Sequence, residues 1–154
     1  MDKEKSIAVL NTLIEINNDR IAGYETAADE TQEADLQSMF SQFIKTSRRF
    51  KEELVTEVQK LGGAPTQETK TEGKVFRAWM GFKTVLTAHH SRSILLFSCE
   101  IGEEVVVDAY SNALSYHGKN LSAEQQIIIS AQYATITDEY GQIKGRRDML
   151  VEQK

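Results

Sequence analysis

The sequence predicts an all-α protein, a four-helix bundle in which a long crossover joins the second helix to the third. One proline and nine glycines in 154 residues leave room for long helices and argue against a sandwich or barrel, which needs many turns. Apolar residues recur at alternating three- and four-residue steps, the spacing of one helix face. The length suits a single domain, which we assign to residues 1–154.

The first two helices each carry one apolar face that is interrupted by a polar residue. The first helix is expected from about residue 3 to about residue 29, with Asn17 in the polar slot. The second has Ser47 at its centre and ends at residues 62–65, because glycine takes the left-handed cap and proline cannot continue a helix. The two faces consist of Ile7, Leu10, Ile14, Ile21, Tyr24 and Ala28, and of Leu36, Phe40, Phe43, Phe50, Leu54, Val58 and Leu61.

The connection from the second to the third long helix spans about 30 residues, whereas the other connections are short. Residues 64–72 are polar and indicate a loop. A short extra helix of about four turns is expected after this loop, followed by His89 and His90. Its apolar positions are Val75, Phe76, Trp79, Met80, Phe82 and Val85.

The last two helices are separated by a break at residues 118–120. Ser91 is a candidate cap for the third long helix, which is expected to end at about residue 117. Ser122 followed by Gln125 has the spacing of a capping box at the start of the fourth. The apolar face of that helix consists of Ile129, Tyr133, Ile136, Tyr140, Ile143 and Leu150.

One long crossover between two short hairpin links is the connectivity of ferritin-like bundles. A plain up-down bundle with an extra helix and a coiled-coil dimer are the alternatives. Several segments also resemble, in order along nearly the whole chain, a small bacterial ferritin-like family known mainly as a domain of unknown function. They are LIEINNDRIAGYE (13–25), SRRF (47–50), LGG (61–63), WM (79–80), CEIGE (99–103) and IKGRRD (143–148). The resemblance implies a ferritin-like bundle and an association with bacterial stress, without an assigned activity.

Composition narrows the possible partners. The formal net charge of −5 disfavours nonspecific binding to nucleic acids or anionic membranes, so neither is expected as a partner. No apolar run approaches the roughly 20 residues of a membrane span, and the first residues lead into an amphipathic segment instead of a signal core. Cys99 is the single cysteine, which excludes an intramolecular disulfide and suits a reducing compartment. We therefore expect a cytoplasmic protein.

The ligand pattern of a ferritin-like di-iron centre is missing. That pattern needs a Glu from each of two helices and a Glu-x-x-His from each of the other two, so that the ligands point inward. The chain contains no Glu-x-x-His. The residues three positions before His89, His90 and His117 are Leu86, Thr87 and Leu114. An intact di-iron centre is therefore not expected, and no cofactor is predicted.

Polar residues on or beside the apolar faces are the candidate interior site. Asn17, Ser47, Tyr140 and Arg147 lie on the faces, and Glu25 and Glu103 flank them, whereas Glu100 is expected to face water. Our first interpretation is an interior hydrogen-bonded network in which Arg147 neutralises Glu25 or Glu103. The alternative is a site for iron or another divalent metal formed by Glu25, Glu103 and Tyr140, which Glu139 could join.

A second apolar strip on the first helix predicts an interface. Val9, Leu13 and Ile16 lie more than about 60° from the main face. Such a strip indicates either a homodimer interface or contact with the crossover helix, and we favour the homodimer. The sequence thus predicts a non-catalytic structural or interaction protein that is associated with stress. The alternative is a metal-binding oxidoreductase or metal-storage protein.

Overall fold

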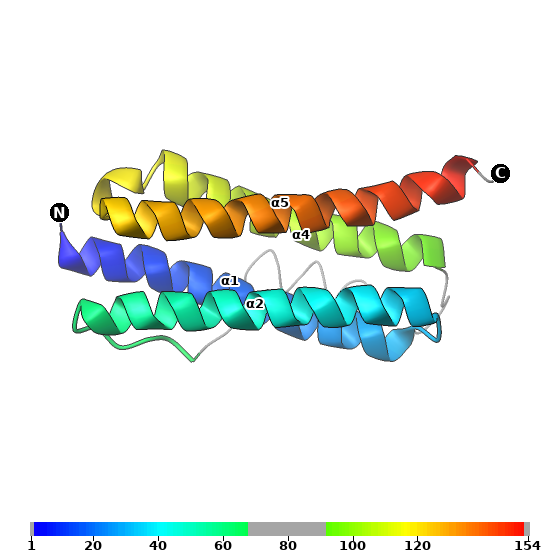
Figure 1. Ribbon diagram of the computed structural model, residues 1–154, viewed down its shortest axis with the longest axis horizontal. Coiled ribbons are helices and arrows are strands. Elements are labelled where there is room, and N and C mark those ends of the chain that lie inside the picture. The colour runs from blue at the N-terminus through cyan, green and yellow to red at the C-terminus, as the bar shows by residue number, and fades with distance from the viewer. Residues whose placement is uncertain (1, 68–91, 153–154) are drawn as a thin grey trace.

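The computed structural model describes residues 2–67 and 92–152, which form a four-helix bundle (Figure 1). The helices are α1 (Lys3–Glu30), α2 (Ala34–Lys60), α4 (Arg92–Ser115) and α5 (Ala123–Glu152), with a short 3₁₀ turn, η1 (Gly118–Asn120), before α5. This confirms the predicted all-α bundle. The first helix ends one residue later than expected, and the third ends at Ser115 instead of about residue 117. The expected helix at residues 75–85 and both His89 and His90 lie outside the described residues.

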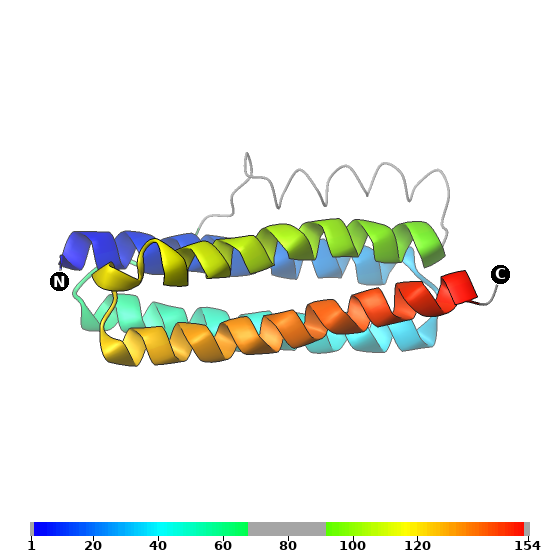
Figure 2. The same cartoon turned by 90° about the horizontal axis from the view of Figure 1, so that it is seen from above.

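The connectivity contains one long crossover. α1 and α2 form one antiparallel hairpin, and α4 and α5 form the other (Figure 1). α2 ends at the end of the bundle opposite the one where α4 begins, so the chain must travel the length of the bundle between them. A second view shows α1 beside α4 and α2 beside α5 (Figure 2). The single crossover is the arrangement found in ferritin-like bundles.

Local signals in the sequence define the helix ends. Asp2 caps α1 by accepting hydrogen bonds from the backbone N–H groups of Glu4 (2.9 Å) and Lys5 (3.3 Å). Gly62 follows α2 with φ +78°, a conformation that glycine adopts without strain. The capping box before α5 is confirmed, since the Ser122 N–H donates to Gln125 Oε1 and the Gln125 N–H donates to Ser122 Oγ.

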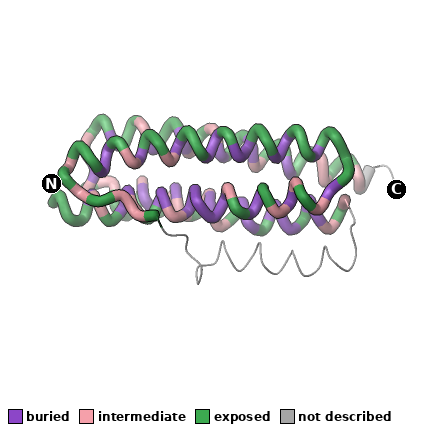
Figure 3. Tube along the Cα trace, turned by 90° about the horizontal axis from the view of Figure 1, so that it is seen from below, coloured by how far each residue is buried: buried purple, intermediate pink, exposed green. Residues whose placement is uncertain are grey.

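The core lies along the bundle axis where the four apolar faces meet (Figure 3). All four helices contribute side chains that are fully inaccessible to water. They include Leu10, Ile14, Tyr24, Leu36, Phe40, Leu54, Val58, Leu96, Val106, Tyr110, Ile129, Ile136 and Ile143. Most of the predicted face residues are therefore buried as expected, and the bundle core closes within one chain. A coiled-coil dimer is not needed to bury these faces.

Candidate functional site

A buried arginine lies at the centre of the bundle. Arg20 of α1 is completely inaccessible to water, although arginine is rarely buried without partners. Its Nε lies 2.7 Å from Glu103 Oε1 of α4, and its Nη2 lies 2.8 Å from Glu139 Oε1 of α5. Its Nη1 donates to Ser47 Oγ of α2 at 3.0 Å. Tyr24 of α1 and Thr46 of α2 contact the same group of side chains. We call this set the charged layer; it consists of Arg20, Tyr24, Thr46, Ser47, Glu103 and Glu139.

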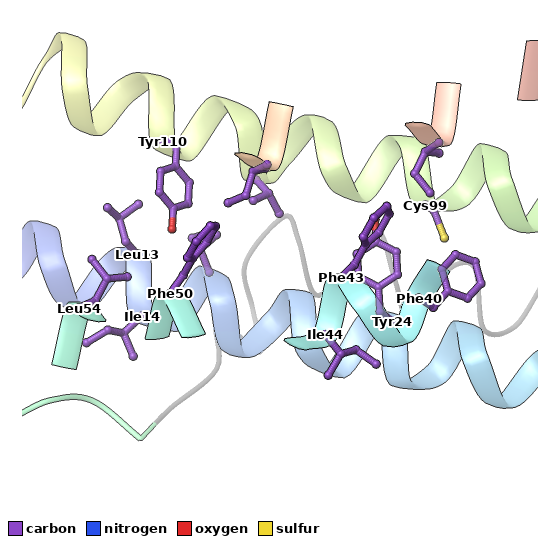
Figure 4. Close-up of a cluster of buried hydrophobic side chains, with 14 of the residues drawn as sticks. Leu13, Ile14, Tyr24, Phe40, Phe43, Ile44, Phe50, Leu54, Cys99 and Tyr110 are labelled. Atoms are coloured by element: carbon purple, nitrogen blue, oxygen red, sulfur yellow. The ribbon is translucent and has the colours of Figure 1, made fainter. Parts of the chain in front are cut away.

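Aromatic rings and carboxylates together stabilise the guanidinium. The Arg20 Cζ lies 5.2 Å from the centroid of the Tyr24 ring and 5.4 Å from that of Phe43, within cation–π distance. Tyr24 also packs against Phe40, with ring centroids 5.4 Å apart (Figure 4). Burial alone lowers the pKa of Arg20, but the adjacent Glu103 raises it above the usual range, so Arg20 remains charged.

Glu103 accepts two strong hydrogen bonds on one oxygen. Its Oε1 receives the Arg20 Nε–H and the Tyr24 O–H, the latter at 2.5 Å. Its Oε2 is buried and has no hydrogen-bond partner among the described residues. Burial, and then the Glu103 charge, raise the pKa of Tyr24 well above its usual value. The same two causes raise the pKa of the buried Cys99 thiol, so Cys99 is not poised as a nucleophile.

Glu139 completes the charged layer from α5. Its Oε1 faces Arg20, and its Oε2 lies 2.8 Å from the Thr46 hydroxyl of α2. Burial raises the pKa of Glu139, and the Arg20 charge opposes this effect. Within the layer one guanidinium thus faces two carboxyl groups, Glu103 and Glu139.

A second polar cluster in the core is built mainly from neutral groups. Asn17 Nδ2 donates to the Tyr110 hydroxyl oxygen at 2.9 Å, and the Tyr110 O–H donates to Gln132 Oε1 at 2.6 Å. Gln132 Nε2 then donates to Glu53 Oε1 at 2.9 Å and to the Phe50 carbonyl at 3.3 Å. We call Asn17, Tyr110 and Gln132 the neutral layer. Figure 4 shows Tyr110 and Phe50 in a different part of the core from Tyr24 and Phe43.

The structure does not bring the three predicted metal ligands together. Glu103 is fully buried in the charged layer, whereas Glu25 is exposed and pairs with the equally exposed Arg48 at 3.4 Å. Tyr140 is only partly buried, and its hydroxyl donates to the exposed Glu104 at 3.1 Å. Of the predicted polar residues, Ser47, Glu103 and Glu139 therefore lie inside in the charged layer, and Asn17 lies inside in the second polar cluster of the core.

Arg147 pairs with another residue than the one expected. Its Nη1 lies 2.7 Å from Glu100 Oε2, and its side chain is 31% exposed. Glu100, which was expected to face water, is instead buried and pairs with Arg147 of α5. The cation that faces Glu103 is Arg20, which the sequence interpretation missed, as it missed the role of Thr46.

A salt-bridge cluster joins three helices at one end of the bundle. Arg92, the first residue of α4, lies 2.6 Å from Glu33 and binds both carboxylate oxygens of Asp35, at 3.1 and 2.8 Å. Arg146 of α5 also reaches Asp35, at 2.7 Å. The hydrogen bonds from Arg92, assisted by the charge of Arg146, lower the pKa of Asp35 to about 2.

The charged layer does not fit a di-iron centre. Such a centre needs imidazole and carboxylate ligands that converge on cations, but here the Arg20 guanidinium lies between the two buried carboxyl groups. Within residues 2–67 and 92–152, no three His, Cys, Asp or Glu side chains are grouped so that they could hold a metal ion. The Arg20 guanidinium thus occupies the place between the two carboxyl groups where a metal cation would have to lie.

The predicted interface strip lines a groove between α1 and α4. The groove has a volume of about 700 Å³, and Val9, Leu13 and Ile16 lie on its α1 side. Its α4 side carries Ala109 and Ala113, with Tyr116 beyond them. The three strip residues are at most 9% exposed, whereas Tyr116 is 72% exposed. The strip residues therefore lie at the base of a groove, with an exposed tyrosine beside it.

A protein-family model described as "Domain of unknown function (DUF2383)" matches residues 5–116. The matched region covers almost all of α1, the whole of α2 and α4, and therefore Arg20, Thr46 and Glu103. No curated protein matches the chain. In the described part of the chain, none of the helices combines the length and the apolar character that crossing a membrane requires.

Proposed function

The chain belongs to this family of domains of unknown function, and we propose that it is a non-catalytic structural or interaction protein. The observation that carries this proposal is the Arg20 guanidinium between Glu103 and Glu139, at 2.7 and 2.8 Å. It supplies internally the positive charge that a metal cation would otherwise provide to these carboxyl groups. A cytoplasmic location and a role in bacterial stress are part of the proposal and rest on the family resemblance and the single cysteine.

Metal content is the direct test. Untagged protein, purified without chelator and incubated aerobically with ferrous iron, should contain far less than one metal ion per chain by mass spectrometry. Glu103→Gln should leave that value unchanged and should lower the midpoint of urea unfolding, because it removes a carboxylate partner from Arg20. One or two tightly held ions per chain, lost in Glu103→Gln without loss of stability, would instead establish metal-dependent chemistry.

We also propose that the chain forms a homodimer through the face of α1 that carries Val9, Leu13 and Ile16. The groove there is apolar at its base, and the exposed Tyr116 ring is a suitable side chain to fill the same groove of a second copy. Lys5 and Lys119 also line the groove, and an interface related by twofold symmetry would bring these like charges close together. Salt should therefore strengthen the dimer.

Light scattering coupled to size-exclusion chromatography tests the dimer. At micromolar concentration the wild type should have twice the 17.4 kDa chain mass, and the dimer fraction should rise with salt. Tyr116→Ser should favour the monomer. Ile127→Ser is the matched control, because Ile127 is similarly exposed (70%) but lies on α5. A wild type that remains at 17.4 kDa under all these conditions would rule the dimer out.

A further inference from the structure

The Thr46 hydroxyl lies between two oxygen atoms that both act as acceptors if Glu139 is ionised. Thr46 Oγ1 is 3.1 Å from the Gln42 carbonyl oxygen, one turn earlier in α2, and 2.8 Å from Glu139 Oε2. A hydroxyl carries a single hydrogen and can donate only once at a time. With Glu139 ionised, one of the two short oxygen–oxygen contacts would have no proton between its atoms. A proton on Glu139 Oε2 satisfies both contacts, because Glu139 then donates to Thr46 and Thr46 donates to Gln42.

The charges of the layer also require one proton. From α1, Arg20 is the cation that faces Glu139, and Tyr24 is neutral because its pKa is raised by burial. From α4, Glu103 adds a negative charge, and Cys99 stays a neutral thiol. α2 contributes the uncharged Thr46 and Ser47. Two ionised carboxylates would leave a net negative charge inside the bundle, which is unfavourable in a medium of low dielectric constant.

The hydrogen bonds determine which carboxyl group carries the proton. Glu103 Oε1 already receives donors from Arg20 and Tyr24, so a hydrogen on that oxygen would oppose them. Glu103 Oε2 has no acceptor within reach among the described residues. Glu139 Oε2 has one, the Thr46 hydroxyl oxygen. If the proton is on Glu139 Oε2, it has the Thr46 hydroxyl oxygen as its acceptor, and the Arg20 and Tyr24 hydrogens keep Glu103 Oε1 as theirs.

We propose that Glu139 forms a buried proton-binding site, in which a neutral carboxylic acid donates from Oε2 to Thr46 in the folded protein at neutral pH. The raised pKa of Glu139, which burial causes, agrees with this assignment. Because the folded chain then holds a proton that the unfolded chain releases above the ordinary glutamate pKa, stability decreases as the pH rises through the folded-state pKa. The site therefore responds to alkaline conditions, independently of any partner or metal.

Two glutamine substitutions in the same layer test the proposal. Glutamine at position 139 reproduces the neutral acid, since its oxygen can accept from Arg20 and its amide nitrogen can donate to Thr46. In urea unfolding, Glu139→Gln should match the wild-type midpoint at pH 6 and exceed it at pH 9. Glu103→Gln should lower the midpoint at pH 6. If Glu139→Gln lowers the pH 6 midpoint as much as Glu103→Gln does, Glu139 is ionised and the proposal is wrong.

A spectroscopic measurement on the wild type keeps the proposal testable if a variant fails to fold. The infrared spectrum at pH 7 should contain the carbonyl stretch of a protonated carboxyl group, and this band should disappear on alkaline titration. Thr46→Val removes the acceptor and should move the loss of the band to lower pH, whereas Thr46→Ser keeps the hydroxyl and should leave it near the wild-type position. Absence of the band in the folded wild type at pH 7 would overturn the proposal.

Discussion

The charged layer and the neutral layer both place hydrogen-bonded polar side chains in the core, but their patterns of bonds differ. Each places polar groups inside an apolar core and connects all four helices. In the charged layer the connections converge on Arg20, whose partners lie on α2, α4 and α5. In the neutral layer they form a chain from Asn17 through Tyr110 to Gln132, which also reaches the Phe50 carbonyl of α2.

The two layers should differ in how much stability is lost when one of their side chains is truncated. Truncating one partner of a buried ion pair leaves an uncompensated charge, which destabilises proteins by about 3–5 kcal/mol. Removing one partner of a neutral hydrogen bond leaves a polar group unsatisfied, which costs about 1–3 kcal/mol. Removing one member should therefore destabilise the protein more in the charged layer than in the neutral layer.

The largest effect is expected for Arg20→Met. This change keeps a side chain of similar length but leaves Glu103 and Glu139 without their cation, so the free energy of unfolding should fall by about 3–5 kcal/mol in urea titration at pH 7. Arg48→Met is the control, because Arg48 pairs with Glu25 at the exposed surface and should change stability by less than about 1 kcal/mol. Equal losses in the two variants would contradict the central role of Arg20.

Replacing the whole ion cluster sharpens the comparison. In Arg20→Met/Glu103→Leu/Glu139→Leu, no buried charge of the cluster remains to be compensated, and well-packed apolar replacements of ion clusters can be neutral or stabilising. The triple variant should therefore be about 1–4 kcal/mol more stable than Arg20→Met alone. Circular dichroism during urea unfolding measures both. A triple variant less stable than the single one would show that the layer contributes packing that leucine cannot replace.

The neutral layer should respond more weakly. Tyr110→Phe removes the hydroxyl that donates to Gln132 and accepts from Asn17, while the ring stays in place. Asn17 Nδ2 still donates to the Leu13 carbonyl at 2.8 Å, so mainly Gln132 Oε1 loses a partner. We expect a loss of about 1–2 kcal/mol in the free energy of unfolding. Tyr133→Phe, at a partly buried position on α5, is the control and should lie closer to the wild type.

The bundle could be predicted from the sequence because helix periodicity and caps are local signals. The four helices, the glycine after α2 and the capping box at Ser122 all depend on residues close together in the chain. The charged layer could not be predicted in this way. Arg20 is separated from Glu103 by 83 positions and from Glu139 by 119, and no pattern within one helix indicates such a pairing.

The errors at individual positions share a physical cause. At two places along the helices, either of two adjacent residues could lie on the buried face. A prediction based on hydrophobicity places the more apolar residue there. The hydrophobic pattern places Ile21 and Tyr140 on inward faces, yet the structure buries the adjacent Arg20 and Glu139 more completely. Mutual neutralisation makes this burial possible, and it depends on the other helices. The spacing of Asn17, Arg20 and Tyr24, which are all buried, is the signal that could have revealed Arg20.

The salt-bridge cluster around Asp35 extends the comparison to the exposed end of the bundle, where the smallest effect is expected. Arg92 and Arg146 hold the pKa of Asp35 at about 2, below its ordinary value of 3.8. A carboxylate with a lowered folded-state pKa stabilises the fold above its unfolded-state pKa, and this contribution is lost as the pH falls towards 2.

Asp35→Asn should therefore have a slightly lower Tm than the wild type at pH 5, and the difference should shrink between pH 4 and pH 2. Asp108→Asn, which removes an equal charge from the exposed face of α4, is the control for net charge.

The buried layers should respond differently to salt, because solvent and salt screen the Asp35 cluster but not Arg20. Raising the salt concentration at pH 5 should therefore reduce the effect of Asp35→Asn and leave that of Arg20→Met unchanged. If salt weakens both equally, the contrast between exposed and buried ion pairs is wrong.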